Sequence, residues 1–403
     1  MPPLPPLSPM VARLEGGSAA AWGVTLRGHA LKAQGQPIVD LGVGDPDFAT
    51  PPRIVAAMER SVRAGRTHYA PAEGEPALRA AVAADARTRL GAQVDAGQVH
   101  VFPGAQCALF AALMCTVGPG DEAVLLAPTY TTYERCVLAI GAVPVAVPLD
   151  AGTHFALDVE RIAAALTPRT RVVLINSPGN PSGAVFDAAD LARLAELCAA
   201  RGLWLISDEV YGSLVFDGRH HSPLAAPAGA ACTVVVNSLS KSHAMTGWRI
   251  GWTIAPPPVA RALRGLSSSL LYGVNQFVQD AAVVALEETA TESRAMTERF
   301  RRRRDTLVAG LDGATGIAVH RPAGGMFVMV DIAATGLDGI AFADGLLDHE
   351  RVVVVPGAAF GPTTRTCLRV GLVADEATLA DAAVRLRRHA ARVTAGPETR
   401  EAL

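Results

Sequence analysis

Short apolar runs alternate with helix-forming segments along most of this chain, and this alternation is the feature that most constrains its fold. From about Pro51 onward, each run is followed by a longer segment rich in Ala, Leu and Arg. The pattern predicts an α/β protein with a mostly parallel central sheet wrapped by helices. The expected strands are 99–102, 123–126, 143–147, 171–175, 203–206 and 233–236. The expected helices are 105–117, 130–139, 187–201 and 276–288.

The length of 403 residues predicts more than one domain, because a single hydrophobic core stops growing near about 250–300 residues. After a long charged helix expected at 291–311, the pattern changes. Strand-like runs at 327–331 and 352–355 are followed by a final helix at 376–393. The domains that we expect are a Pro-rich arm at 1–15, a small α+β domain made of 16–47 and 290–403, and a large domain at 48–289.

The composition gives no sign of a nucleic-acid or membrane partner, since 36 basic and 38 acidic residues leave a formal charge of −2. The basic run 299–304 has helical spacing and predicts a solvated helix face. Six cysteines without a C-x-x-C pair or metal-ligand spacing predict reduced thiols. Neither an export signal nor a membrane span is evident, so we expect a cytoplasmic protein.

Polar residues follow several of the expected strands at the point where each strand ends. The first strand leads into Gly104 and a helix, an arrangement in which backbone N–H groups can bind a phosphate. Two later strands are followed by Asn176 and Asn180, and by Asp208. Taken alone, each feature is also explained by a plain turn or a helix N-cap. Ligands bind at the carboxyl ends of parallel strands, so the features together predict a binding site.

Lys241 follows the apolar run 234–236 and lies among hydroxyl side chains. A lysine is a nucleophile only when it is neutral, so its reference pKa of about 10.4 must fall before it reacts with a carbonyl group near neutral pH. Burial at a strand end and a nearby cation would both lower that pKa. Ser238, Ser240 and Arg249 are donors that suit a phosphate. The segment therefore suits covalent binding of an anionic aldehyde, which would be pyridoxal phosphate.

The other polar residues complement such a ligand. A pyridine ring accepts electrons only while its nitrogen is protonated, and a buried carboxylate such as Asp208 would maintain that proton. Tyr211 and Asn180 could donate to the ring hydroxyl, and Tyr130 could stack on the ring. The motifs of Rossmann and P-loop phosphate sites, of serine hydrolases and of zinc proteases are not found in the sequence.

A set of motifs in fixed order carries a resemblance to a known family. They are 42–48, 68–70, 180–183, 208–211, the lysine segment 238–252, 324–327 and 368–371. From about Leu41 to Leu372 the chain resembles the class I/II aminotransferases of the fold-type I pyridoxal-phosphate enzymes. The resemblance implies a fold-type I transferase with pyridoxal 5'-phosphate as cofactor, no metal, and amino acids and 2-oxo acids as substrates.

The resemblance also implies roles for individual residues. Lys241 would hold the cofactor covalently and move the substrate proton, Asp208 would pair with the ring nitrogen, and Tyr211 would contact the ring oxygen. The further cofactor contacts are Ala105, Gln106, Tyr130, Asn180, Ser238, Ser240 and Arg249. The substrate contacts are Gly44, Trp22, Asn180 and Arg369, of which Arg369 would hold the α-carboxylate. Tyr69 would reach the phosphate of a partner subunit, which implies a homodimer with shared active sites.

Several runs, among them 102–109, 237–249, 271–273 and 19–22, are similar to those of the arginine:pyruvate transaminases. This similarity implies a guanidino amino acid as substrate and a 2-oxo acid such as pyruvate as its partner, in a ping-pong reaction. Glu15, Asp45 and Asp47 are acidic residues that could face a guanidinium. An aminotransferase for an aromatic, aliphatic or dicarboxylic amino acid remains an alternative, as does a fold-type I lyase. A non-enzymatic ligand sensor is disfavoured, because the stretch before the first motif is short and has no basic helix-turn-helix pattern.

Overall fold

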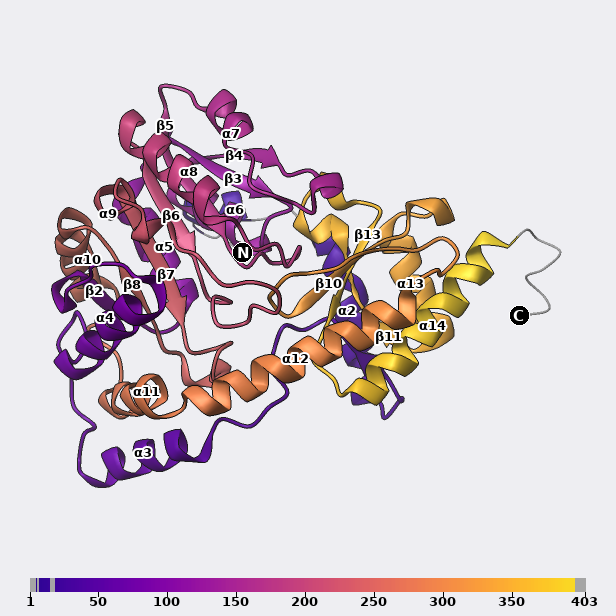
Figure 1. Ribbon diagram of the computed structural model, residues 1–403, viewed down its shortest axis with the longest axis horizontal. Coiled ribbons are helices and arrows are strands. Elements are labelled where there is room, and N and C mark those ends of the chain that lie inside the picture. The colour runs from indigo at the N-terminus through magenta and orange to yellow at the C-terminus, as the bar shows by residue number, and fades with distance from the viewer. Residues whose placement is uncertain (1–4, 6, 15–18, 396–403) are drawn as a thin grey trace.

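The computed structural model describes residues 5, 7–14 and 19–395. Its largest element is a seven-stranded sheet with the strand order β2-β8-β7-β6-β5-β3-β4. The strands are β2 Val99–Phe102, β3 Glu122–Ala127, β4 Val143–Pro148, β5 Thr170–Asn176, β6 Trp204–Asp208, β7 Thr233–Ser238 and β8 Gly251–Ile254. β3 to β7 pair in parallel, whereas β8 runs antiparallel to β2 and β7. The predicted mostly parallel sheet is confirmed (Figure 1).

Helices cover both faces of this sheet. They are α4 Pro76–Leu90, α5 Ala105–Thr116, α6 Thr131–Ile140, α7 Val159–Ala165, α8 Ala188–Arg201, α9 Gly229–Cys232, α10 Pro257–Leu270 and α11 Gln276–Glu288. Helix α3, Pro52–Arg63, packs against α11 (Figure 1). Side chains alternate across β5, so Leu174 packs in the cluster with α5, α6 and α10, while Val173 packs with α7 and α8. This burial on both faces explains why the strands are continuous apolar runs in the sequence.

A second group of elements contains the antiparallel sheet β12-β13-β10-β9 and the parallel pair β1-β11. Its strands are β1 Val39–Asp40, β9 Ala318–His320, β10 Phe327–Asp331, β11 Val352–Val353, β12 Val355–Pro356 and β13 Cys367–Gly371. Its helices are α2 Ala19–Ala33, α12 Ala290–Leu311, α13 Gly339–Glu350 and α14 Glu376–Thr394. The expected strand 352–355 is two strands, because the chain passes from one sheet to the other at Val354.

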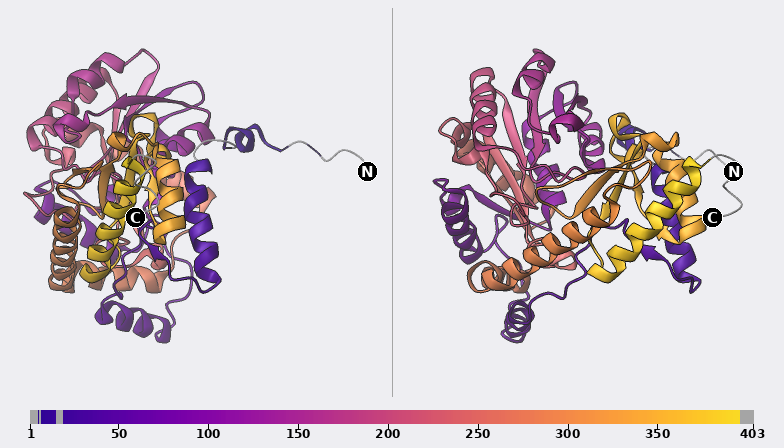
Figure 2. Two further views of the ribbon diagram at one scale, coloured as in Figure 1. Left: turned by 90° about the vertical axis from the view of Figure 1, so that its right-hand side faces the viewer. Right: turned by 45° about the vertical axis from the view of Figure 1, so that its right-hand side comes forward.

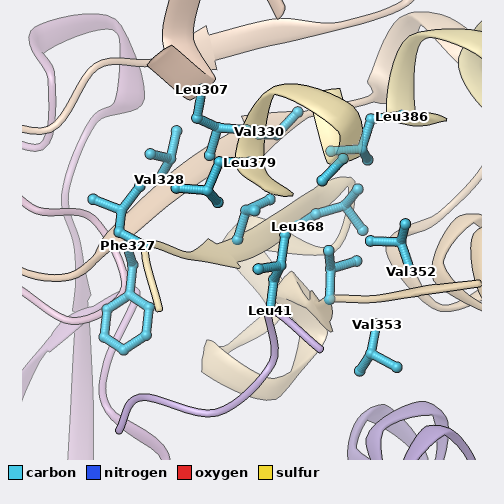
Figure 3. Packing of buried hydrophobic residues seen from close by; sticks show 14 of the residues in the cluster. Leu41, Leu307, Phe327, Val328, Val330, Val352, Val353, Leu368, Leu379 and Leu386 are labelled. Atoms are coloured by element: carbon cyan, nitrogen blue, oxygen red, sulfur yellow. The ribbon is translucent and has the colours of Figure 1, made fainter. Parts of the chain in front are cut away.

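The packing of this second group joins sequence segments that are far apart. Figure 3 shows Val330 of β10 and Leu368 of β13 near Leu307 of α12 and Leu379 of α14, all fully buried. Leu41, from the segment after β1, belongs to the same cluster. This is the arrangement that we expect of a small domain made of an N-terminal and a C-terminal segment, and Figure 2 shows it beside the large sheet. The domain boundaries themselves stay a prediction.

The basic run 299–304 in α12 agrees with the sequence prediction only in part, since Arg299 and Arg302 are exposed as expected but two other arginines are not. Arg303 and Arg304 are each 1% exposed, not solvated. Arg303 binds both carboxylate oxygens of Asp47, at 2.6 and 2.7 Å, and Arg304 pairs with Asp217. A guanidinium tolerates burial when a bidentate carboxylate partner faces it, and sequence spacing alone does not reveal such distant partners.

The predictions about thiols and membrane helices can be compared directly with the structure. All six cysteines are free. In the part of the chain that the structure covers, no helix is both long and apolar enough to cross a membrane. Of the predicted N-terminal arm, residues 1–4, 6 and 15 lie outside the described residues. Helix α1, Pro9–Leu14, lies at α6, where Arg13 Nε donates to the carbonyl of Leu138 at 2.9 Å.

Candidate active site

The carboxyl ends of the parallel strands lie along one edge of the large sheet, and a cavity of about 380 Å³ opens there. Its lining comes from the ends of β2, β3, β5, β6 and β7 or the segments after them, from the segment after β1, and from β10, β13 and α2. The lining residues are Trp22, Gly42, Val43, Gly44, Ala105, Gln106, Leu109, Tyr130, Tyr133, Asn176, Asn180, Asp208, Val210, Tyr211, Ser238, Ser240, Lys241, Thr246, Arg249, Phe327 and Arg369. All the predicted site residues except Tyr69 are therefore in one cavity.

Lys241 lies in this cavity just beyond the end of β7. Its Nζ donates a hydrogen bond to the Gly44 carbonyl at 2.5 Å. Burial is the main cause that lowers the pKa of Lys241 to about 8; the positive charges of Arg369 and Arg249 contribute to this shift, and the negative charge of Asp45 opposes it. A pKa near 8 leaves an appreciable neutral fraction at physiological pH, so this amine can act as a nucleophile or a base.

The lowered pKa can be measured directly, because Lys32 and Lys241 are the two lysines of the chain. We expect acylation of the Lys241 amine by a small anhydride, followed peptide by peptide across pH, to show a midpoint near pH 8. The sign follows from burial, which disfavours the ammonium and makes the neutral amine available at lower pH. Lys32 is exposed and provides the reference peptide in the same sample. A Lys241 midpoint above pH 10 would contradict the assignment.

Asp208 is the last residue of β6 and is 7% exposed. Burial raises the pKa of its carboxyl to about 6, although two hydrogen bonds oppose the shift. The hydroxyl of Tyr133 donates to Asp208 Oδ2 at 2.6 Å, and the backbone N–H of Val210 donates to Oδ1 at 3.2 Å. A nearby cation would stabilise this buried carboxylate, and a protonated ring nitrogen would be such a cation.

Arg369 lies in β13, where its backbone is paired with Met329 of β10. Its guanidinium donates to Asn180 Oδ1 at 3.0 Å and to the Gly42 carbonyl at 2.6 Å. The group stacks on the Phe327 ring at 4.0 Å. Burial lowers the pKa of Arg369 to about 10.

No carboxylate lies within ion-pair distance of Arg369 in the described residues, and its buried Nε has no hydrogen-bond partner there. A buried guanidinium without a carboxylate partner carries a large desolvation cost. The arrangement therefore suits a carboxylate that arrives with a ligand, and Arg369 can bind it through a planar fork of donors.

The turn before α5 forms a cradle for an anion. Gly104 has φ +89° and precedes the first N–H groups of the helix, which have no side-chain cap. A Cβ at Gly104 would overlap the guanidinium of Arg249. Arg249 itself adopts φ +53° and donates to the Thr246 carbonyl at 2.7 Å. Helix N–H groups, an arginine and the hydroxyl of Ser238 thus converge where a phosphate can be bound.

Aromatic and amide groups complete the wall of the cavity. Burial raises the pKa of Tyr211, so its phenol stays neutral and can donate a hydrogen bond. Tyr130 contacts Tyr133 edge-to-face, with ring centroids 5.5 Å apart. Asn176 Nδ2 donates to the Asp208 carbonyl at 2.9 Å, and the Asn180 N–H donates to Asn176 Oδ1 at 2.8 Å. Asn176 therefore fixes two neighbouring strand ends relative to each other.

Sequence reasoning placed Asn176 at a strand end of the site without giving it a role, and it missed Tyr133 and Phe327 as members of the site. The motif 324–327 contains Phe327 but indicates no role for its ring. Nothing in the sequence around Tyr133 predicts a site residue, because its hydrogen-bond partner is 75 residues away in the sequence. Tyr69 is the predicted residue that the cavity does not include. Tyr69 is 82% exposed, and the centroid of its ring lies 5.3 Å from the centroid of the Tyr272 ring.

The geometry defines a site that can bind an aldehyde at a lysine, a phosphate at a helix N-terminus and a carboxylate at an arginine. Residues 36–386 match the family "Aminotransferase class I and II". This chain belongs to that family and is an aminotransferase.

Named relatives and solved structures agree with this assignment. The chain is 49% identical to arginine–pyruvate transaminase from Pseudomonas aeruginosa, over 94% of this chain and 96% of that protein. It is 38% identical to aspartate/prephenate aminotransferase from Thermus thermophilus, over 85% and 90% of the two chains. The structure of aspartate aminotransferase from Thermus thermophilus with maleate superposes with a TM-score of 0.90 at 34% identity, covering 96% of this chain and all of that one.

Proposed function

We propose that this aminotransferase uses pyridoxal 5'-phosphate and moves an amino group between L-arginine, or a related guanidino amino acid, and a 2-oxo acid such as pyruvate in a ping-pong reaction. The observation that carries the cofactor proposal is the presence of Lys241, Asp208, Arg249 and Arg369 in one cavity. The similarity to arginine–pyruvate transaminase over nearly the whole chain supports the substrate proposal.

The residues present fit this cofactor. Lys241 would hold the aldehyde carbon, and Asp208 would face the ring nitrogen. The cradle at Gly104, with Arg249 and Ser238, would bind the phosphate. Because Gly104 has no Cβ, the Arg249 guanidinium can lie next to this turn. When bound, the cofactor supplies an electron-poor ring that stabilises negative charge at the substrate α-carbon.

The chain's own residues supply binding, orientation and proton transfer. Arg369 binds the substrate α-carboxylate, and Asn180 orients that guanidinium through its Oδ1 atom. Lys241 is the base that takes the α-proton and returns it, since its pKa of about 8 is close to the operating pH. Tyr133 holds one oxygen of Asp208, so that the carboxylate keeps a fixed orientation.

The substrate side chain would extend toward the mouth of the cavity. Within the described part of the lining, Asp208 is the single acidic side chain, and it lies deep in the site. Asp47 is bound by Arg303, and Glu15 lies outside the described residues. The remaining candidate for a carboxylate near the substrate side chain is Asp45. It accepts a hydrogen bond from Thr246 Oγ1 at 2.7 Å, and its negative charge acts to raise the pKa of Lys241.

We therefore propose Asp45 as the carboxylate that attracts a guanidinium, and Trp22 as an aromatic surface along the substrate chain. Thr246 lines the cavity, so its bond to Asp45 brings this carboxylate to the edge of the site. An exposed carboxylate gives modest attraction by itself, and stacking on an aromatic ring adds to it.

A donor screen tests the substrate proposal. Arginine and homologous guanidino acids are compared with aspartate, alanine and aromatic amino acids, with pyruvate or 2-oxoglutarate as acceptor. We expect the best guanidino donor to exceed the others at least tenfold in kcat/KM, about 1.4 kcal/mol of transition-state binding. Asp45→Asn should lower kcat/KM for arginine about fivefold while that for alanine stays within twofold. If an aromatic or dicarboxylic donor is tenfold better than every guanidino compound, the substrate proposal is wrong.

The main alternative is a dicarboxylic donor, because several relatives are aspartate or aspartate/prephenate aminotransferases at 33–38% identity. Among the described residues that line the cavity, the guanidinium groups are those of Arg249 and Arg369, and the proposal uses both. A distal carboxylate would need a further cation. The lyase alternative has less support, because the named relatives are aminotransferases.

We further propose a homodimer in which Tyr69 completes the neighbouring site. The support is the exposure of Tyr69 and Tyr272, at 82% and 66%, on one face. Large exposed aromatic side chains that contact each other mark an interaction surface. Sedimentation should give about twice the mass of one 41.8 kDa chain, and a monomer that keeps full turnover would refute the shared site. A cytoplasmic location stays a prediction.

A further inference from the structure

A second and larger cavity, of about 510 Å³, lies behind the lysine segment. We call it the rear cavity. Asn237, Leu239, Ser242 and His243 line it, whereas Ser240 and Lys241 line the active site. Ser238 contributes to both linings. The rear cavity is therefore a separate space that shares a wall with the active site.

Trp252 of β8 and the C-terminal half of α11 contribute apolar surface to the remaining walls, and three other elements contribute the polar groups. They are the C-terminal half of α4, the loop that follows Tyr211 and the N-terminal half of α12. The polar and charged residues that they contribute are Asp85, Arg89, Ser213, Arg219, His220, Ser293, Arg294, Thr297 and Glu298. Pockets of about 300–1,000 Å³ with a few convergent polar groups are the usual size for small ligands.

Most of the charges in these walls are already neutralised by a partner. Arg89 binds both oxygens of Asp85 at 2.7 Å. Glu298 accepts from Arg301 at 2.6 and 2.8 Å, which occupies both of its oxygens. His220 Nε2 lies 3.0 Å from Glu209 Oε2.

Two cations in the walls are not neutralised. Arg219 and Arg294 are both exposed, and in the described chain neither has a carboxylate within ion-pair distance. Arg294 donates only to the hydroxyl of Thr291, at 3.3 Å. The uncompensated charge of the rear cavity is therefore positive, which favours an anion.

One buried atom adds a second requirement for the ligand. His220 Nδ1 is buried and has no partner among the described residues. When Nε2 donates to Glu209, Nδ1 is an acceptor, and a ligand hydroxyl or amino group could satisfy it after a small movement of the His220 ring uncovers this atom, which the surrounding side chains now cover. A buried polar atom without a partner costs roughly 1–3 kcal/mol, and this cost would be relieved on binding.

We propose that the rear cavity binds a small organic acid, with carboxylate at Arg219 and Arg294 and a hydroxyl or amino group at His220. Guanidinium groups bind carboxylates through paired N–H donors, and the hydroxyls of Ser242, Ser293 and Thr297 line the same space. The site is distinct from Arg369, which binds the substrate carboxylate in the other cavity.

The test uses malate and succinate, which differ by one hydroxyl. Each is titrated calorimetrically into the cofactor-loaded enzyme at constant ionic strength. We expect saturable binding in which malate binds at least fivefold more tightly than succinate. The double variant Arg219→Ala/Arg294→Ala should weaken malate binding tenfold or more, while its KM for the amino donor stays within twofold of wild type. Arg201→Ala removes an exposed arginine of α8 outside this cavity and should change neither value.

Each other outcome overturns the proposal. Absence of saturable malate binding would show that the rear cavity takes no such acid. Malate binding that survives the double substitution would place the ligand elsewhere, for example at Arg369. Equal affinities for malate and succinate would remove the role of His220 Nδ1.

Discussion

Lys241→Ala is expected to abolish transamination and the visible absorbance of the cofactor-loaded enzyme. The substitution removes both the amine that would hold the cofactor and the base that moves the α-proton. General base catalysis contributes about 10²–10⁴-fold by itself, so we expect kcat to fall by at least about 10³-fold. Steady-state rates and absorbance spectra measure the two effects on the same samples.

The chain provides an unusually clean control for this experiment. Lys32 is its one other lysine, and it is exposed on α2. Lys32→Ala should keep colour and turnover, and borohydride reduction of the loaded wild-type enzyme should label the peptide of Lys241 alone. Lys241→Arg keeps a positive charge without a nucleophilic amine, and should be as inactive as the alanine variant. A Lys241→Ala enzyme that stays coloured and active would remove the basis of the proposed function.

The amino-acid sequence predicted the parts of this site whose signal is local. Asp208 and Lys241 each follow a short apolar run, so the strands that position them can be recognised without tertiary information. The carboxyl ends of parallel strands lie together, and this rule brought the two residues into one predicted site. β8 was not predicted, because it has only four residues and the first two of them belong to the lysine segment 238–252.

Contacts between distant segments could not be predicted in the same way. Arg303 and Arg304 read as a solvated basic face, yet their partners Asp47 and Asp217 are 256 and 87 residues away. Tyr133 looks like an ordinary helix residue until β6 brings Asp208 to its hydroxyl. Helical spacing specifies which residues share a face, but tertiary packing decides whether that face meets water or a buried carboxylate.

Asp208→Asn is expected to lower kcat/KM by at least about 10³-fold, or roughly 4 kcal/mol of transition-state stabilisation. The amide occupies the same space but carries no charge, so it cannot keep a ring nitrogen protonated. Tyr133→Phe tests the same carboxylate with a smaller expected effect on kcat/KM. It removes the 2.6 Å hydrogen bond that holds the pKa of Asp208 down, so that this pKa should rise further and kcat/KM should fall about tenfold.

A variant of the adjacent carboxylate, Glu209, tests whether catalysis needs a negative charge at the ring nitrogen or only a negative charge close to it. Glu209 is fully buried, accepts from Ser207 and Ser222, and does not line the active-site cavity. Glu209→Gln removes a buried negative charge one residue from Asp208 and keeps an oxygen acceptor, so we expect kcat/KM within about fivefold of wild type. Circular dichroism should show that both variants are folded. If Asp208→Asn keeps more than a tenth of the wild-type kcat/KM, or if Glu209→Gln is equally damaged, the loss reflects the local fold and Asp208 has no special role in charge pairing.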